Sequence, residues 1–214
     1  MLGFELSRPD QATDGETVAV LLHGRGSHRG DLQALRPRLP EAWTLLTPEA
    51  PHPGHPWGYG PGWAWYRYEA QDRLDEETLQ KSLAALDGFL AEMPHLVGFT
   101  PGRVVLGGFS QGGTTSMAYG FTRPAEVDLV LNFSGFLADV SLLDGTLGPE
   151  VPPVFWGHGL QDPNIPHDLA RKGRARLAEH QVPHRTGDYG IGHWIDPAEL
   201  DDALDFIRIF GDEG

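Results

Sequence analysis

Short apolar runs rich in β-branched residues alternate with longer amphipathic stretches along this chain. This alternation is typical of a mainly parallel β-sheet covered by α-helices. The runs that predict strands are Thr17–Leu22, Trp43–Thr47, Val104–Phe109, Val127–Phe133 and Pro153–Gly157, with His184–Tyr189 as a weaker candidate for an edge strand. We therefore expect an α/β fold with a mainly parallel central sheet flanked by helices and no separate lid domain.

Helical periodicity appears between these runs. One buried helix face is predicted by the apolar residues Leu79, Leu83, Leu86, Leu90 and Met93. A second long helix is expected over Ile165–Gln181. The last helix should begin after Asp196, which is a favourable N-cap, and Glu199 three residues later resembles a capping box. Its apolar stripe is Leu200, Leu204, Ile207 and Phe210.

Length and charge narrow the class of protein. The 214 residues fit one α/β domain, residues 1–214, better than two small ones. The formal net charge of −14 argues against nucleic acid and anionic membranes as partners. Cysteine is absent, which excludes thiol catalysis. Because no basic leader and no membrane-length apolar run occurs, we expect no membrane span and a cytoplasmic location.

The strongest chemical signal is Gly108-Phe109-Ser110-Gln111-Gly112, which follows a predicted strand and leads into a predicted helix. Glycine two residues before and two after a serine on such a turn is the pattern of a hydrolase nucleophile elbow. The tight turn leaves no room for side chains beside the serine. We therefore predict Ser110 as a nucleophile; the alternative is an ordinary glycine-rich turn.

A serine hydroxyl needs a base to accept its proton and a carboxylate to orient that base. His193 lies late in the chain after Gly192, which would let its loop approach the serine closely. Asp162 follows the fifth strand, which produces the order serine, aspartate, histidine expected for this elbow. Asp188 is the competing carboxylate. The oxyanion would be bound by the backbone amides of Gln111 and Arg25.

With these motifs together, the chain resembles the phospholipase/carboxylesterase group of the α/β-hydrolase fold, which includes acyl-protein thioesterases. The resemblance rests on Leu22-His23-Gly24-Arg25-Gly26, Gly107–Gly113, His158–Pro166 and Gly192-His193, and it extends from about Val18 to Phe210. It implies the triad Ser110, Asp162 and His193, the same two oxyanion amides, and a compact lidless hydrolase that is often a homodimer.

The proline- and tryptophan-rich segment Pro48–Tyr68 predicts a long loop near the site. Trp65 and Tyr66 resemble a family pair beside the active site, and Phe136 follows the fourth strand, so all three are candidates for the substrate pocket. Core packing is the alternative for each. His52 and His55 lack a nearby third ligand, so we expect no metal and no cofactor.

The expected function is hydrolysis of small carboxylic esters by a serine hydrolase through an acyl-enzyme. Acyl thioester or lysophospholipid cleavage is the alternative within the same class. A non-catalytic ligand-binding module on a hydrolase scaffold is the alternative from a different class, because fold does not determine function.

Overall fold

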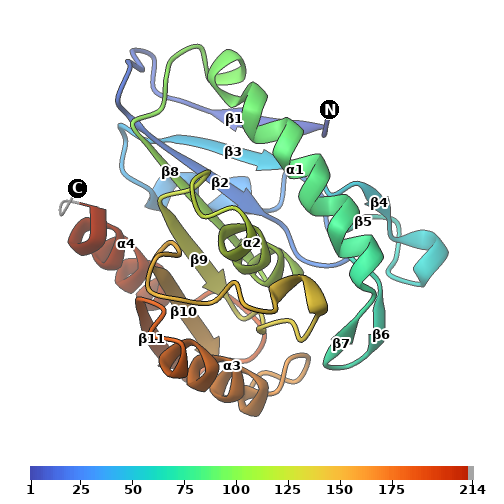
Figure 1. The fold of residues 1–214 in the computed structure, drawn as a ribbon. Helices are drawn as coiled ribbons and strands as arrows, with labels where there is room; N and C mark the ends of the chain where they lie inside the picture. The colour runs from blue at the N-terminus through green and yellow to red at the C-terminus, as the bar shows by residue number, and fades with distance from the viewer. Residues whose placement is uncertain (212–214) are drawn as a thin grey trace.

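Seven strands form one sheet in a computed structural model that describes residues 1–211 (Figure 1). In spatial order they are β1 (Phe4–Ser7), β3 (Thr44–Pro48), β2 (Thr17–Leu22), β8 (Arg103–Phe109), β9 (Leu129–Phe133), β10 (Val154–Gly159) and β11 (His184–Tyr189). Within this seven-stranded sheet, β1 pairs antiparallel with β3 and all other neighbouring strands are parallel. The predicted α/β class with a mainly parallel sheet is confirmed.

All six predicted strands occur in the sheet, and two of them, β2 and β11, have the predicted bounds. The strand β1 was not predicted. It is four residues long, and only Phe4 and Leu6 supply an apolar alternation. Its position depends on pairing with β3, where Phe4 lies opposite Pro48 and Ser7 opposite Leu45. A strand this short carries too little local pattern to be recognised without its partner.

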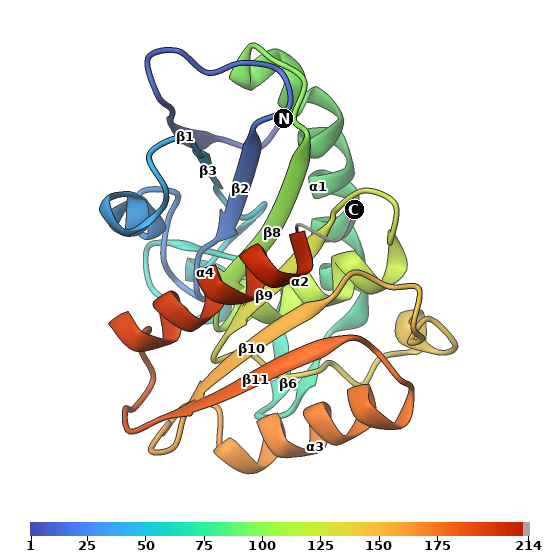
Figure 2. The ribbon, with the colours of Figure 1, turned by 90° about the vertical axis from the view of Figure 1, so that its left-hand side faces the viewer.

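Helices cover both faces of the sheet (Figure 2). The larger apolar core lies between one face and the helices α1 (Glu76–Val97), α2 (Gln111–Thr122) and α3 (His167–Glu179). The opposite face packs on α4 (Pro197–Gly211) and the 3₁₀ helix η1 (Leu32–Arg38). Strand β2 is buried on both faces, because Val20 packs in the core beneath α1, α2 and α3 and Leu21 packs on the opposite face, beneath η1 and α4.

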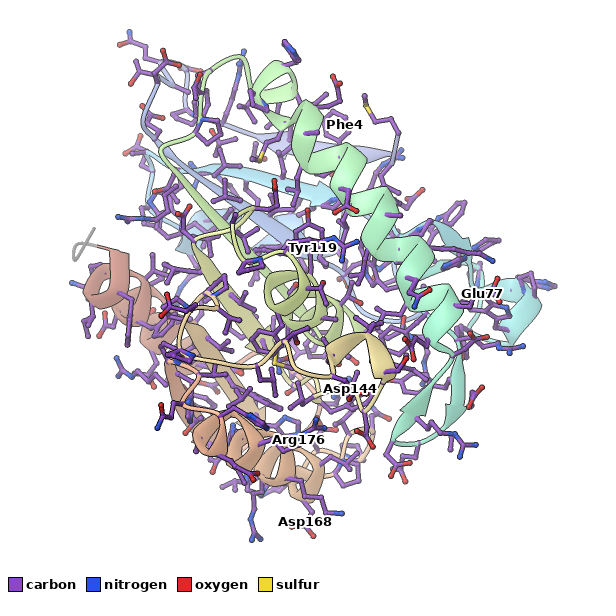
Figure 3. All side chains as sticks on the ribbon, viewed as in Figure 1. Phe4, Glu77, Tyr119, Asp144, Asp168 and Arg176 are labelled. Carbon is purple, nitrogen blue, oxygen red and sulfur yellow. The ribbon has the colours of Figure 1, made fainter. Side chains whose placement is uncertain are left out.

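Acidic side chains occur at the start and on the exposed surfaces of helices. Asp75 caps α1 by accepting hydrogen bonds from the amides of Glu77 and Thr78. The side chains of Glu77 and Asp168 point into solvent from α1 and α3 (Figure 3). In the described part of the chain, none of the helices is both long and apolar enough to cross a membrane.

The proline-rich segment is more structured than predicted. It contains β4 (His52–Pro53), the 3₁₀ helix η2 (His55–Trp57) and β5 (Trp63–Ala64), and it leads into a hairpin of β6 (Tyr68–Ala70) and β7 (Arg73–Leu74). A bridge between Ser27 and Trp63 joins the segment to the loop after β2. These pairings are too short to produce a strand pattern in the sequence.

A buried carboxylic acid stands at the start of α4. The Asp196 amide donates to Glu199 Oε2 at 3.1 Å, and the Ala198 amide donates to Asp196 Oδ1 at 2.8 Å, so the capping arrangement is confirmed. Glu199 is fully buried, and its Oε1 has no hydrogen-bond partner within residues 1–211. Burial raises the pKa of Glu199 to about 8, against the opposing effect of the Asp196 amide.

This pKa makes stability depend on pH. The folded state keeps the Glu199 proton up to about pH 8, whereas an unfolded chain releases it near 4.5. The contribution of Glu199 to the free energy of unfolding is therefore fully present below pH 4.5 and is lost as pH rises through 8. Between these two values the free energy of unfolding falls by up to about 1.4 kcal/mol per pH unit. We expect Glu199→Gln, which does not titrate, to flatten this slope in urea unfolding measured at several pH values. The exposed Glu179→Gln is the control, and parallel wild-type and Glu199→Gln curves would contradict the assignment.

Candidate active site

Ser110 occupies the turn between β8 and α2. Its backbone has φ 55° and ψ −115°, a conformation that residues with a side chain rarely adopt. The turn is held by the Ser110 amide, which donates to the Phe133 carbonyl at 2.8 Å, and by the Thr114 amide, which donates to the Ser110 carbonyl at 3.1 Å. The serine thus stands on a strained and well-supported turn at the carboxyl edge of the sheet, as the motif predicted.

The turn can form only because the neighbouring residues lack side chains. A Cβ on Gly112 would lie 1.9 Å from the Leu22 carbonyl oxygen, and one on Gly108 would lie 2.5 Å from the same atom. These glycines let the end of β2 approach the start of α2. The loop that follows Leu22 is therefore brought next to Ser110.

The three residues predicted as a triad are in contact. His193 Nε2 lies 2.9 Å from Ser110 Oγ, and His193 Nδ1 lies 2.6 Å from Asp162 Oδ2. A carboxylate only accepts hydrogen bonds, so Nδ1 carries the proton and donates it to Asp162. The lone pair of Nε2 then faces the serine hydroxyl. This is the arrangement in which a histidine can accept the serine proton.

Asp162 is held in its ionised form. Burial alone would raise its pKa, but hydrogen bonds from His193 and from the amides of Ile165 and Asn164 outweigh this effect and lower the pKa. The two amides donate to Oδ1 at 2.9 and 2.8 Å, which leaves Oδ2 for His193. His158 lies 3.7 Å from Oδ2 and is fully buried.

The loop of His193 packs tightly against the end of β10, and this contact depends on Gly159 more than on Gly192. A Cβ on Gly159 would lie 2.1 Å from the Gly192 carbonyl oxygen, whereas a Cβ on Gly192 would meet no atom closer than 3.7 Å. The close approach therefore requires Gly159. On its other side, the imidazole of His193 contacts the ring of Phe109, with centroids 4.6 Å apart.

Arg25, in the loop after β2, lines the same cavity as Ser110, and buried His23 anchors this loop. His23 Nδ1 donates to the Gly24 carbonyl at 2.8 Å, and Nε2 accepts from the Ala50 amide at 3.1 Å. Burial lowers the pKa of His23 to about 4, so the ring is neutral, as this pair of bonds requires. Within residues 1–211, the amides of Arg25 and Gln111 have no hydrogen-bond acceptor.

The side chain of Gln111 binds the backbone of the proline-rich segment. Its amide group accepts from the Trp65 backbone amide at 3.0 Å and donates to the Tyr66 carbonyl at 2.8 Å. The Trp65 indole donates to the His23 carbonyl at 2.9 Å. Gln111 and Trp65 thus join three segments behind the serine: the start of α2, the loop after β2 and the proline-rich segment.

The assignment of Trp65, Tyr66 and Phe136 to the pocket wall needs correction. Trp65 and Tyr66 are 0% exposed and Phe136 is 2% exposed, and none of them lines the cavity. Their rings fill the core behind it. Phe136 stacks on Tyr68, with ring centroids 6.3 Å apart, and Tyr68 forms the wall in their place.

An open cavity of about 420 Å³ lies over Ser110 and His193. Its remaining lining residues are Gly24, Arg25, Ser27, Asp31, Tyr68, Ala70, Gln71, Phe109, Asn164 and Ile165. Most of these side chains come from the loop after β2 and from the β6 hairpin. Sequence reasoning did not name Tyr68, Gln71 or Asn164 as cavity residues. Tyr68 ends the segment Pro48–Tyr68 and Asn164 lies within the motif His158–Pro166, but neither pattern shows which side chain faces the cavity.

Two other candidates have partners elsewhere. Asp188, the competing carboxylate, binds Arg174 at 2.6 Å and His167 at 2.9 Å, so it is held away from the triad. His52 Nε2 lies 3.0 Å from the Thr78 carbonyl oxygen and donates to it.

Comparison with known protein families matches residues 8–210 to the phospholipase/carboxylesterase family. Among individual proteins, acyl-protein thioesterase 1 of Yarrowia lipolytica is 25% identical over 94% of this chain and 94% of its own length. Acyl-protein thioesterase 1 of Emericella nidulans is 28% identical over 65% of this chain. That match spans 60% of the relative, and several others span about half of theirs.

Solved structures show the same fold. The esterase PE8 superposes with a TM-score of 0.79 at 26% identity, covering 98% of this chain and 99% of that one. The carboxylesterase of Bacillus cereus superposes with a TM-score of 0.82 at 18% identity, covering 98% and 95%. The family match covers nearly the whole chain, and the protein belongs to the phospholipase/carboxylesterase family of the α/β-hydrolase fold.

Proposed function

We propose that this protein is a serine hydrolase that cleaves carboxylic esters through an acyl-enzyme. The observation that carries the proposal is the pair of hydrogen bonds linking Ser110, His193 and Asp162, at 2.9 and 2.6 Å. A serine so paired is activated for attack on a carbonyl. The cavity directly over Ser110 leaves space for a substrate.

In the proposed reaction, Ser110 Oγ forms a bond to the ester carbonyl carbon while its proton moves to His193 Nε2. The bond to the leaving alcohol then breaks, and His193 returns the proton to that oxygen. A water molecule then attacks the acyl carbon while His193 accepts one of its protons. The bond to Ser110 Oγ breaks and His193 returns the proton to that oxygen, which releases the acid and restores Ser110. Asp162, held ionised by its three hydrogen bonds, stabilises the imidazolium formed in each step.

The negative charge that develops on the carbonyl oxygen needs preorganised donors. The amides of Arg25 and Gln111 suit this role because neither has an acceptor among the described residues and Gln111 opens α2. The start of a helix adds a favourable partial positive charge. The hydrogen bonds of His23 keep the Arg25 loop in place before a substrate arrives.

The cavity favours small esters. Much of its lining is polar, with Ser27, Asp31, Gln71 and Asn164 among its residues. A second candidate, cleavage of long acyl thioesters, is favoured by a separate apolar pocket of about 130 Å³ beyond Phe109, where Trp194 is 71% exposed. The Yarrowia and Emericella relatives are named acyl-protein thioesterases, which also favours a thioester substrate.

The first test is covalent labelling of the serine. We expect a fluorophosphonate probe to add its mass to Ser110, and Ser110→Ala to lose the label and about 10⁶-fold in turnover. Ser134→Ala is a matched control, because Ser134 is also buried with φ 55° but lies at the end of β9. A chain that stays unlabelled would support the non-catalytic binding module.

The second test separates the two carboxylates. Asp162→Asn should lower turnover about 10⁴-fold, because an amide in place of the carboxylate no longer favours the Nδ1–H form of His193. Asp188→Asn, the same substitution on β11, should leave turnover within a few-fold of wild type. Steady-state hydrolysis of a nitrophenyl ester measures both. The reverse ranking would make Asp188 the third triad member.

The third test addresses substrate size. We expect kcat/KM for nitrophenyl esters to be highest for acyl chains of about two to six carbons, because the cavity lacks a continuous apolar lining for a longer chain. The same series should be measured with thioesters of equal length. An optimum at long chains, or a strong preference for thioesters, would favour the thioesterase alternative.

A further inference from the structure

Arg25 lines the catalytic cavity and differs from the other arginines in its contacts. Most arginines in the described part of the chain form ion pairs with Asp or Glu, and Arg8 and Arg36 bind backbone carbonyls. Arg103 also has a partner. In residues 1–211, the guanidinium of Arg25 has no carboxylate or carbonyl acceptor, although the protein has a net charge of −14.

The guanidinium of Arg25 lies over the rings of two tyrosines. Its central carbon lies 5.0 Å from the ring centroid of Tyr59 and 5.3 Å from that of Tyr68. The rings are themselves tied together, since the Tyr68 amide donates to the Tyr59 hydroxyl at 2.7 Å. Burial raises the pKa of Tyr68, so its hydroxyl is neutral and does not form an ion pair with Arg25. A cation–π contact uses none of the N–H donors of the guanidinium, so these donors are available to a ligand.

Besides Arg25, the described residues that line the cavity include one aspartate or glutamate, Asp31, and no lysine or second arginine. The Asp31 carboxylate accepts a hydrogen bond from Ser27 Oγ at 2.6 Å and makes no ion pair with Arg25. No carboxylate among the described residues therefore forms an ion pair that balances the positive charge of Arg25. An arginine fork binds a carboxylate through two parallel hydrogen bonds, which fixes the ligand's orientation.

We propose that Arg25 is a specificity residue that binds a carboxylate on the substrate, so that the preferred substrates are esters bearing a negative charge in addition to the scissile bond. This inference rests on the proposed esterase function of Ser110. The carboxylate could belong to the acid part, as in a half-ester of a dicarboxylic acid, or to the alcohol part. Both sources present the same chemistry to the guanidinium.

The test compares esters matched in length and different in charge. For the acid part, mono-4-nitrophenyl glutarate is compared with its methyl-capped diester; for the alcohol part, 4-acetoxybenzoate is compared with its methyl ester. We expect wild-type kcat/KM to be higher for the charged member of at least one pair. Arg25→Gln should reduce that charged-to-capped ratio about tenfold or more, because a charge-assisted hydrogen bond is lost.

Arg29→Gln is the matched control. It removes the same charge four residues away, from a side chain outside the cavity that pairs with Glu49 at 3.7 Å, and it should leave the ratio unchanged. An equal fall of both members of each pair in Arg25→Gln, or an equal change of the ratio in Arg29→Gln, would overturn the inference while leaving the esterase in place. Failure of wild type to hydrolyse any of the four esters would overturn the proposed function as well.

Discussion

The active site depends on one close approach between two pieces of backbone. The carbonyl oxygen of Leu22, at the end of β2, would lie only 1.9 Å from a Cβ on Gly112, which is too close for any side chain. Because α2 begins against the end of β2, the serine turn and the loop bearing the Arg25 amide are neighbours before any side chain is considered. The remaining parts, the Asp162 turn and the His193 loop, extend from the next strands of the same sheet edge.

Hydrogen bonds between buried polar groups then hold the segments around the active site in place. Gln111, Trp65 and His23 form hydrogen bonds in the interior that connect α2, the proline-rich segment and the loop after β2. Each polar atom involved is paired, so rotation of any one group would leave a buried donor or acceptor without a partner. Residues that contact no cavity therefore still determine its shape, and this is why the aromatic pair Trp65 and Tyr66 lies in the core.

The sequence predicted the parts of this protein that are encoded locally. Strand β11 has its predicted bounds, and Ser110, Asp162 and His193 were found from a motif and their order along the chain, which reflect the order of strands in the sheet. The cavity wall could not be predicted in this way. Trp65 and Tyr68 lie three residues apart in an irregular segment, and which of them faces the substrate depends on distant partners such as Gln111. The crowding at Gly159 was not predicted for the same reason, because it comes from Ile191 and Gly192, more than thirty residues later in the chain.

The division of the site between segments has a consequence for evolution. The groups proposed for the chemistry stand at strand ends and in turns that the core holds, whereas the cavity wall is contributed largely by the β6 hairpin and the loop after β2. Ala70 and Gln71 lie at the turn of that hairpin, where substitutions disturb little packing. After gene duplication, descendants of this chain could therefore acquire new substrate preferences by mutation of a few hairpin residues while inheriting an unchanged reaction centre.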